Sequence, residues 1–434
     1  MHATDRDLLR LALPALAALV AEPIYVLTDT AMVGHLGTTE LAGLAVASAV
    51  LLTGYSLCIF LAYGTTSAVG RLLGAGQARA AGEQAIDGLW LAAGLGVVLA
   101  VVGWVGGPSL ISLLGGRGEV AEQAGIYLRI SLLGVPALLA SLAALGYLRG
   151  LQDTRTPLWV ALGAAVGNGL LEWWLIFGLG FGIGASAAST VAAQTAAAGV
   201  FVWRVARQAR RHGARLGPRP RQLARLAVVG GHLLVRTAAL RGSLLVGVGV
   251  ATRIGTAEVA AYEIAFQVWS LGALALDAVA IAAQSLVSRA LGASDRDGAM
   301  AVARRALVLS AGSGVVLGAA AVALRQPLGQ LFSDDARVVA LVGFSLLFVG
   351  AMQPVNGVVF ALDGILIGAG DQRFLALAMA AAFALYAPLA VGVALAGLGL
   401  GWLWGALCVL MMARGTVLVG RLMSGRWAVV GAAR

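Results

Sequence analysis

Long apolar segments follow one another from end to end of the 434-residue chain. Most are about twenty residues or longer, the length that an α-helix needs to cross a bilayer, whereas a membrane β-strand needs about ten alternating residues. The pattern predicts an all-α polytopic membrane protein. Its twelve transmembrane helices are expected at residues 8–34, 41–70, 87–106, 122–148, 156–179, 184–206, 223–252, 258–288, 302–324, 338–368, 372–395 and 398–420.

The short segments that join these helices occur twice, 218 positions apart and without a gap. The matching pairs are Leu36-Gly-Thr-Thr-Glu-Leu-Ala42 with Ile254-Gly-Thr-Ala-Glu-Val-Ala260, Arg71-Leu-Leu-Gly-Ala75 with Arg289-Ala-Leu-Gly-Ala293, and Asp153-Thr-Arg155 with Asp371-Gln-Arg373. We therefore expect an N-terminal six-helix lobe at 1–206, a basic cytoplasmic linker at 207–222, and a C-terminal lobe with a short cytoplasmic tail at 223–434. Two parallel repeats of this kind are typical of secondary transporters.

Composition agrees with a membrane protein, because 60% of the residues are hydrophobic and only 12% are charged. The formal net charge is +10, and the chain has arginine but no lysine. Most arginines fall in alternate loops, which is the positive-inside pattern and places both termini in the cytoplasm of a cell (inner or plasma) membrane. For the eight arginines of 204–225, contact with anionic lipid is a sufficient explanation, although a regulatory patch stays open. We expect no nucleic-acid partner.

Motifs for enzyme chemistry are missing from the sequence. A phosphate-binding loop needs a lysine, which this chain lacks. The four histidines are scattered and have no metal-ligand spacing, while Cys58 and Cys408 lie inside apolar segments. The chain is therefore not expected to be an enzyme or to hold a cofactor.

Four polar side chains in the first half are predicted to lie at a similar depth in the membrane, on three different helices: Asp29, Asn168, Glu172 and Thr190. An ionisable group in hydrocarbon is costly and usually functional. Two carboxylates close together need a cation or a shared proton, so the cluster is expected to couple to H⁺ or to bind Na⁺ through hard oxygen ligands. A hydrogen-bond network that only fixes helix packing is the alternative.

The first predicted helix contains two prolines, Pro14 and Pro23, and each removes a backbone hydrogen bond. Tyr25, Asp29 and Met32 fall on one face beyond Pro23. A bend at Pro23 that responds to protonation of Asp29 is one hypothesis, with Tyr25 and Met32 as possible substrate contacts. A static kink that only shapes a cavity is the other.

The second half lacks this chemistry at the matching positions, which are Gly247, Tyr386 and Ala390. It has other charged residues within its apolar segments, namely Arg236, Arg241, Asp277 and Asp363. Arg241 and Asp277 are expected near mid-depth, where they could form a buried ion pair. A structural pair, a substrate contact and a second proton site stay open for Arg241, Asp277 and Asp363. Single aromatic and Met residues such as Met352 could line an apolar drug cavity.

The segment Pro23-Ile-Tyr-Val-Leu-Thr-Asp29-Thr-Ala-Met-Val-Gly34-His-Leu-Gly37 resembles the multidrug and toxic compound extrusion (MATE) transporters. Gly167-Asn-Gly-Leu-Leu-Glu172 and Gly182-Ile-Gly-Ala-Ser-Ala-Ala-Ser-Thr190 look like two further motifs of that family, and Leu362-Asp-Gly364 before Gly370-Asp371 looks like its DinF-like branch. The resemblance covers nearly the whole chain. It implies two six-helix lobes forming a V, with Asp29, Asn168, Glu172 and Thr190 as the cation site and Pro23 at the helix bend.

One position departs from the family pattern, because Glu172 stands where the family usually has Asp. The additional methylene moves the carboxylate by roughly 1.5 Å, the length of one C–C bond. A Na⁺ site would be distorted more than a proton site, which slightly favours H⁺.

The sequence thus predicts a cation-coupled antiporter that exports drugs and other amphiphilic, often cationic compounds by alternating access, as a monomer in the bilayer. A flippase for lipid-linked precursors is the alternative. A receptor or scaffold without transport is a third hypothesis, and it predicts no effect of Asp29→Asn on any solute flux.

Overall fold

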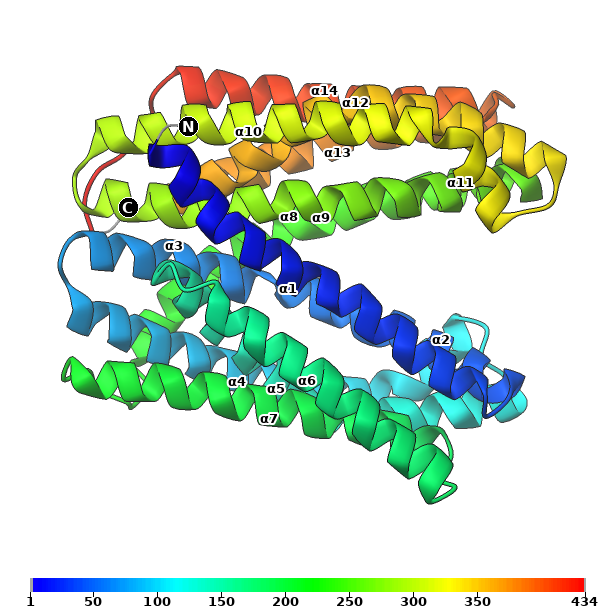
Figure 1. The fold of residues 1–434 in the computed structure, drawn as a ribbon, viewed down its shortest axis with the longest axis horizontal. Coiled ribbons are helices and arrows are strands. Elements are labelled where there is room, and N and C mark those ends of the chain that lie inside the picture. Colours follow the sequence, from blue (N-terminus) through cyan, green and yellow to red (C-terminus); the bar gives the residue numbers. More distant parts are fainter. Residues whose placement is uncertain (1–2, 433–434) are drawn as a thin grey trace. The chain divides into compact units, whose positions relative to one another are not determined.

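A computed structural model describes residues 3–432. Within that range the chain forms only helices (Figure 1). They are α1 (Ala3–Gly34), α2 (Thr38–Cys58), α3 (Phe60–Gly74), α4 (Ala78–Leu113), α5 (Gly118–Gly150), α6 (Arg155–Trp173), the π-helix η1 (Trp174–Gly178), α7 (Ile183–Arg211), α8 (Pro220–Ile254), α9 (Thr256–Gly292), α10 (Arg296–Ala323), α11 (Arg325–Phe332), α12 (Ala336–Gly368), α13 (Gln372–Leu395) and α14 (Leu400–Met423).

Twelve helical segments of the described chain are long and apolar enough to cross a membrane, which confirms the predicted all-α fold class with twelve spans. Two of them are not single α-helices. The span Thr38–Gly74 is interrupted at Ile59, and the span Arg155–Gly178 ends in the π-helix. The short helix α11 follows α10 and was not predicted, because the sequence there has too few apolar residues for a span.

The repeat is visible in where the helices begin. The starts of α2 and α9, of α4 and α10, and of α5 and α12 are each 218 positions apart, at Thr38 and Thr256, Ala78 and Arg296, and Gly118 and Ala336. The two halves are therefore built from the same succession of elements. An even number of spans in each half makes the repeats parallel, as predicted.

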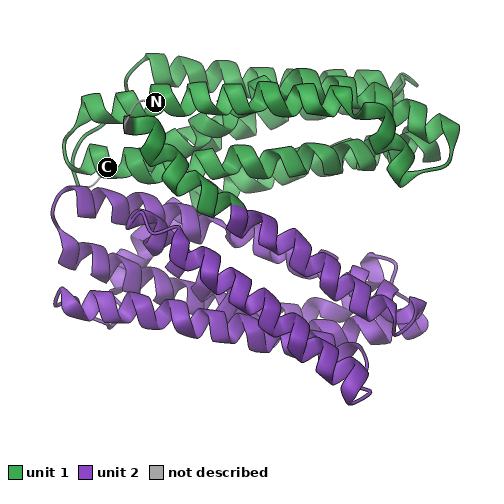
Figure 2. Ribbon diagram, viewed as in Figure 1, with its two compact units in different colours: residues 1–16, 231–432, 434 green, residues 17–230, 433 purple. Residues whose placement is uncertain are grey.

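The chain folds into two compact units, shown in two colours in Figure 2. One contains residues 17–230, and the other contains the start of α1 up to Leu16 together with residues 231–432. The chain thus passes from one unit to the other within α1 and again within α8. The lobes predicted at 1–206 and 223–434 follow the repeat, whereas the units divide inside these two helices.

An ion pair holds the beginning of each of these two helices to the unit that contains that beginning. The carboxylate of Asp5 on α1 accepts hydrogen bonds of 2.6 Å from Nε and Nη2 of Arg305 on α10. In the other unit, Arg219 just before α8 donates to Asp87 on α4 at 2.8 and 2.6 Å, and to Glu83. Positions 87 and 305 are equivalent in the repeat, so the two clamps use the same place on α4 and α10 with the charges reversed.

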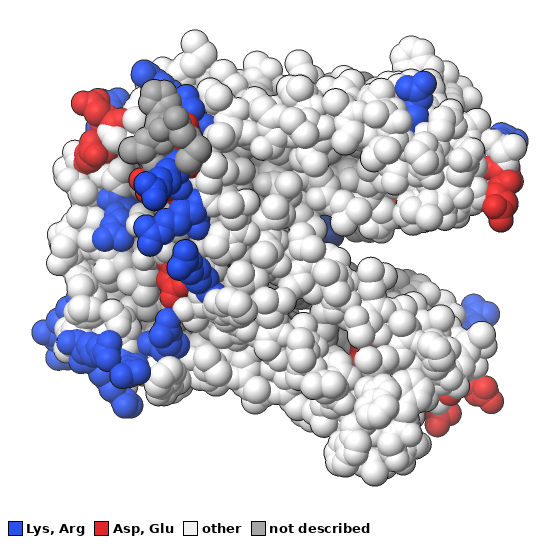
Figure 3. Space-filling view, in the orientation of Figure 1, with Lys and Arg blue, Asp and Glu red and all other residues white. Residues whose placement is uncertain are grey.

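Charged side chains gather at the helix ends of each unit, and the long flanks between are nearly free of charge (Figure 3). This distribution is expected for surfaces that face lipid, because hydrocarbon does not solvate charge. Exposed flank positions carry apolar residues such as Leu133, Val166 and Leu245. The chain is therefore a multi-pass membrane protein, as predicted.

Candidate functional site

The four predicted cation-site residues come together inside the unit 17–230, from α1, α6 and α7. Asp29 and Glu172 are 6% and 0% exposed, and Asn168 and Thr190 are also buried. The Nδ2 atom of Asn168 donates to Oε2 of Glu172 at 3.2 Å. The hydroxyl groups of Thr190 and Tyr25 lie 2.7 Å apart, so Tyr25 touches the cation-site cluster. Its role as a substrate contact stays a prediction.

Ser186 is a member of this cluster that the sequence analysis did not identify. Its Oγ atom donates to Oδ1 of Asp29 at 2.5 Å and is fully buried. The side chain of Tyr127 on α5 also lies close to those of Asp29 and Ser186. A signal for Ser186 was present, since it lies one turn before Thr190 in the quoted motif. Tyr127 has no such signal, because it is brought in by tertiary packing alone.

Each of the three helices contributes two side chains spaced by four residues, which places them on one helix face. The pairs are Tyr25 with Asp29, Asn168 with Glu172, and Ser186 with Thr190. On α6 the pair ends at Glu172, two residues before Trp174, where the π-helix begins. Such widened turns are frequent at functional sites, and here the change of helix type comes within one turn of Glu172.

The cluster has more buried acceptor oxygens than donors. Oδ1 of Asn168 and Oε1 of Glu172 accept no hydrogen bond from the described residues. The carboxylate of Asp29 lies close enough to that of Glu172 for the two charges to repel each other. Since an unpaired buried acceptor and two neighbouring carboxylates are both costly, the set fits either a proton shared between the acids or a hard cation bound by oxygens. No cluster of three or more His, Cys, Asp or Glu suited to a metal exists within residues 3–432.

Met32 and Pro23 lie on α1 beside this cluster. The tip of Met32 would lie 4.0 Å from a Cβ added to Gly169, next to Asn168 on α6. The backbone of α1 is helical without interruption through Pro23. The role of Pro23 as the bend of the helix stays a prediction, as does the role of Met32 as a substrate contact.

The second half pairs its buried charges differently from the prediction. Asp363 on α12 accepts hydrogen bonds from Nη2 of Arg236 on α8 and, at 2.7 Å, from Nη2 of Arg414 on α14. Arg241 is exposed, so the expected buried pair of Arg241 with Asp277 is wrong. The reason is helix geometry: five residues after Arg236, Arg241 points about 140° away from it around α8. Asp277 is half-buried and has interactions of its own.

Arg414 was missed because a single arginine inside a long apolar segment gives no indication of its partner. It is 4% exposed, and its other contact is a hydrogen bond of 3.7 Å from Nη1 to the sulfur of Met411. Of the four second-half charged residues singled out from the sequence, Arg236 and Asp363 thus lie in this buried ion cluster, where Asp363 binds two arginines.

Comparison with known proteins identifies the family of the chain. The model of the MatE family matches residues 14–174 and 235–391. Protein DETOXIFICATION 44, chloroplastic, of Arabidopsis thaliana is 31% identical over 97% of this chain and 81% of its own length. DNA damage-inducible protein F of Escherichia coli K12 is 29% identical over 96% and 91%. The bent form of the Vibrio cholerae MATE transporter VcmN has the same fold, with a TM-score of 0.89, 20% identity and 98% of each chain covered.

Proposed function

Because the chain belongs to the MatE family, we propose that it is a cation-coupled antiporter that exports amphiphilic organic compounds from the cytoplasm. The observation that carries the proposal is the buried pair of acids, Asp29 and Glu172, with unsatisfied oxygens beside them. A packing network would be more stable with its acceptors satisfied. Relatives whose names describe multidrug resistance, such as the probable NorM protein of Thermotoga maritima, support an organic substrate.

The coupling step follows from the electrostatics of the pair. With both acids ionised and no cation present, the two charges repel each other in a medium of low dielectric constant. A cation that enters from outside removes this repulsion, and its release to the cytoplasm restores it. The conformation that opens the site to each side would therefore be favoured in turn, which is the energetic basis of alternating access.

We take the proton as the coupling ion. A proton needs only one carboxyl oxygen, and Oε1 of Glu172 is free to carry it. A Na⁺ ion needs several oxygens at once, and Oδ1 of Asp29 and the hydroxyl of Thr190 are already engaged by Ser186 and Tyr25.

The Arg-rich ends support a cytoplasmic position for both termini in a cell membrane, and the monomer is expected to be the working unit. Because the exposed flanks in Figure 3 are apolar, the bilayer itself is the first partner.

Efflux of ethidium from proteoliposomes tests the proposal, with a pH gradient and a Na⁺ gradient imposed separately. We expect the pH gradient to drive efflux, and Asp29→Asn and Glu172→Gln each to abolish it. Glu22→Gln is the matched control, because Glu22 is an acid on the same helix that is exposed. Unchanged efflux by Asp29→Asn would contradict the proposal, and efflux driven by Na⁺ alone would replace the proton by sodium.

A further inference from the structure

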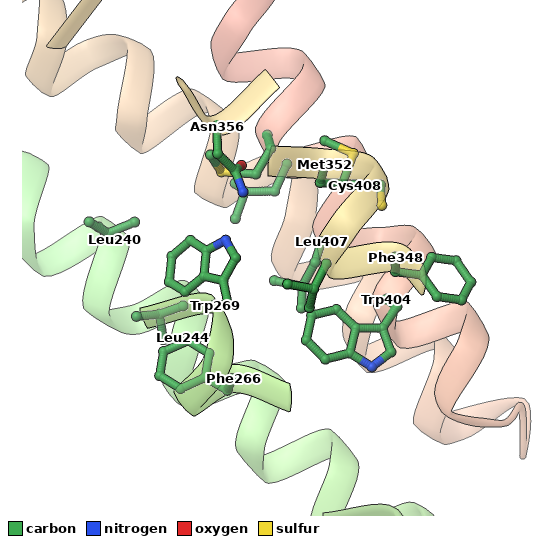
Figure 4. Close-up of a pocket in the computed structure, with 13 residues that line it drawn as sticks. Leu240, Leu244, Phe266, Trp269, Phe348, Met352, Asn356, Trp404, Leu407 and Cys408 are labelled. Carbon is green, nitrogen blue, oxygen red and sulfur yellow. The ribbon is translucent and has the colours of Figure 1, made fainter. Parts of the chain in front are cut away.

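An apolar pocket lies within the unit that contains residues 231–432, between α8, α9, α12 and α14 (Figure 4). Four aromatic side chains contribute to its lining, Phe266, Trp269, Phe348 and Trp404, and aliphatic and Met side chains complete it. Phe266 and Trp269 lie 5.3 Å apart by their ring centres, and the pocket has no charged side chain in its lining. Aromatic rings with few polar groups are typical of sites for small organic molecules.

The pocket shares two helices, α8 and α14, with the second-half counterpart of the cation site. Trp404 and Cys408, which line it, stand 218 positions after Ser186 and Thr190. Gly247 and Ala390, which match Asp29 and Glu172, do not line the pocket, although Ala390 belongs to the same buried cluster as Trp404. The second half thus has no acid at the matching positions and carries an aromatic pocket near them.

Asn356 on α12 interrupts the apolar lining of this pocket. It is 1% exposed, and its Nδ2 atom donates to Oε1 of Gln353 at 3.3 Å. Its Oδ1 atom accepts no hydrogen bond from the described residues. A buried carbonyl oxygen without a donor is unfavourable, so a bound molecule that brings an N–H or O–H group would satisfy it.

Nearby charges leave the pocket itself neutral. Arg236 and Arg414 lie one turn from the lining residues Leu240 and Met411, but both direct hydrogen bonds to Asp363. A lipid chain would fill the apolar part and leave Oδ1 of Asn356 unsatisfied. The lining therefore favours an aromatic ring with a hydrogen-bond donor.

We propose that this pocket binds an aromatic ring of the transported compound, with Asn356 accepting a hydrogen bond from it. Transport of this compound rests on the proposed function, whereas its binding in the pocket does not. The pocket is partly open and its free volume is about 40 Å³, so a ring enters by moving flexible side chains such as Met352 and Leu407. The two halves would then have divided the work, with the ion in the first and the aromatic group in the second.

Equilibrium binding of ethidium to the purified full-length protein, followed by fluorescence anisotropy, tests this proposal. Ethidium is planar, and its amino groups are N–H donors. Leu244→Trp fills the pocket, while Leu245→Trp is the matched control because Leu245 is 71% exposed on the same helix. We expect Leu244→Trp to weaken binding about tenfold or more, since even 1.4 kcal/mol of lost contact has that effect. Leu245→Trp should bind as the unchanged protein does.

A second variant, Asn356→Leu, removes the acceptor and keeps the approximate volume. One net hydrogen bond corresponds to a weakening of about two- to tenfold. Each variant is first checked for a single symmetric peak in size-exclusion chromatography. If ethidium does not bind, or if Leu244→Trp and Leu245→Trp bind it equally, the proposal is overturned.

The failure of this proposal can be told apart from that of the antiporter. If no gradient drives efflux but Leu244→Trp still weakens ethidium binding and Leu245→Trp does not, the pocket proposal is supported and the antiporter proposal is rejected. If efflux is coupled to protons while both pocket variants bind ethidium normally, the antiporter stands and the pocket is rejected. Loss of co-purifying phospholipid from Leu244→Trp, seen by native mass spectrometry with ethidium binding unchanged, would show a lipid site instead.

Discussion

Replacing Asp363 by Asn should destabilise the protein more than removing one of the arginines that it binds. Asp363 is 7% exposed and accepts hydrogen bonds from both Arg236 and Arg414. The variant Asp363→Asn keeps the shape of the side chain and removes its charge. Arg414 is then a buried guanidinium whose remaining hydrogen bond in the described structure is to a sulfur.

The magnitude follows from the cost of an uncompensated buried charge, which is about 3–5 kcal/mol. For a unit of this size each kcal/mol lowers the melting temperature by about 2–4 °C, so the expected decrease is about 6–20 °C. Arg414→Met removes one of the two donors and leaves Asp363 paired with Arg236. That variant should cost less, about 1.5–3 kcal/mol, because one charged hydrogen bond is lost while the carboxylate stays paired with Arg236.

Cys408 provides the assay, since its thiol is free, partly buried and in the same unit as Asp363. A thiol-reactive dye that fluoresces on reaction would report the temperature at which the purified protein unfolds. Asp371→Asn is a suitable comparison, because the partner of Asp371, Arg421, is more accessible to water. Equal melting temperatures for Asp363→Asn and Arg414→Met would refute the view that the one carboxylate of Asp363 stabilises both buried arginines.

Two further predictions concern packing and the linker. Gly364→Ala should lower stability by about 1–3 kcal/mol, because the new Cβ would lie 2.3 Å from the carbonyl oxygen of Ala280 on α9. Gly392→Ala, with no atom within 4 Å, should be neutral or stabilising in the same thermal assay. Asp87→Asn should weaken the hold on Arg219, which Glu83 still binds, and trypsin should then cleave the linker at 207–222 roughly tenfold faster, since a charged hydrogen bond contributes about 1.5–3 kcal/mol. An unchanged digestion rate on gels would show that Asp87 does not hold the linker.

Much of the fold follows from the sequence, because the signals involved are long and redundant. A span of about twenty apolar residues has few alternatives to a membrane helix. Leu36-Gly37 and Ile254-Gly255 are 218 positions apart, like the other matching pairs, and this common spacing revealed the repeat. The break at Ile59 had no such signal, because no proline marks it.

For the candidate site, depth along a helix could be counted but the direction of each side chain could not. The number of residues from the helix ends predicted a similar membrane depth for four residues: Asp29, Asn168, Glu172 and Thr190. The structure brings these four side chains together. The same counting paired Arg241 with Asp277 and was wrong, because level alone does not say which face of α8 an arginine occupies. Partners such as Tyr127 depend on how helices far apart in sequence pack, which one sequence does not encode locally.

The passage of the chain between units inside α1 and α8 bears on how the protein is made. The unit 17–230 is complete once the ribosome has added Gly230, so it can assemble early. The first turns of α1 must wait much longer, since Asp5 finds Arg305 only after α10 has been synthesised. The unit 17–230 is thus one continuous stretch of polypeptide, whereas the other unit combines the opening turns of α1 with residues 231–432. Cutting the gene between the repeats would give two fragments that each lack the opening turns of one helix and hold those of the other, so they should be stable only when produced together.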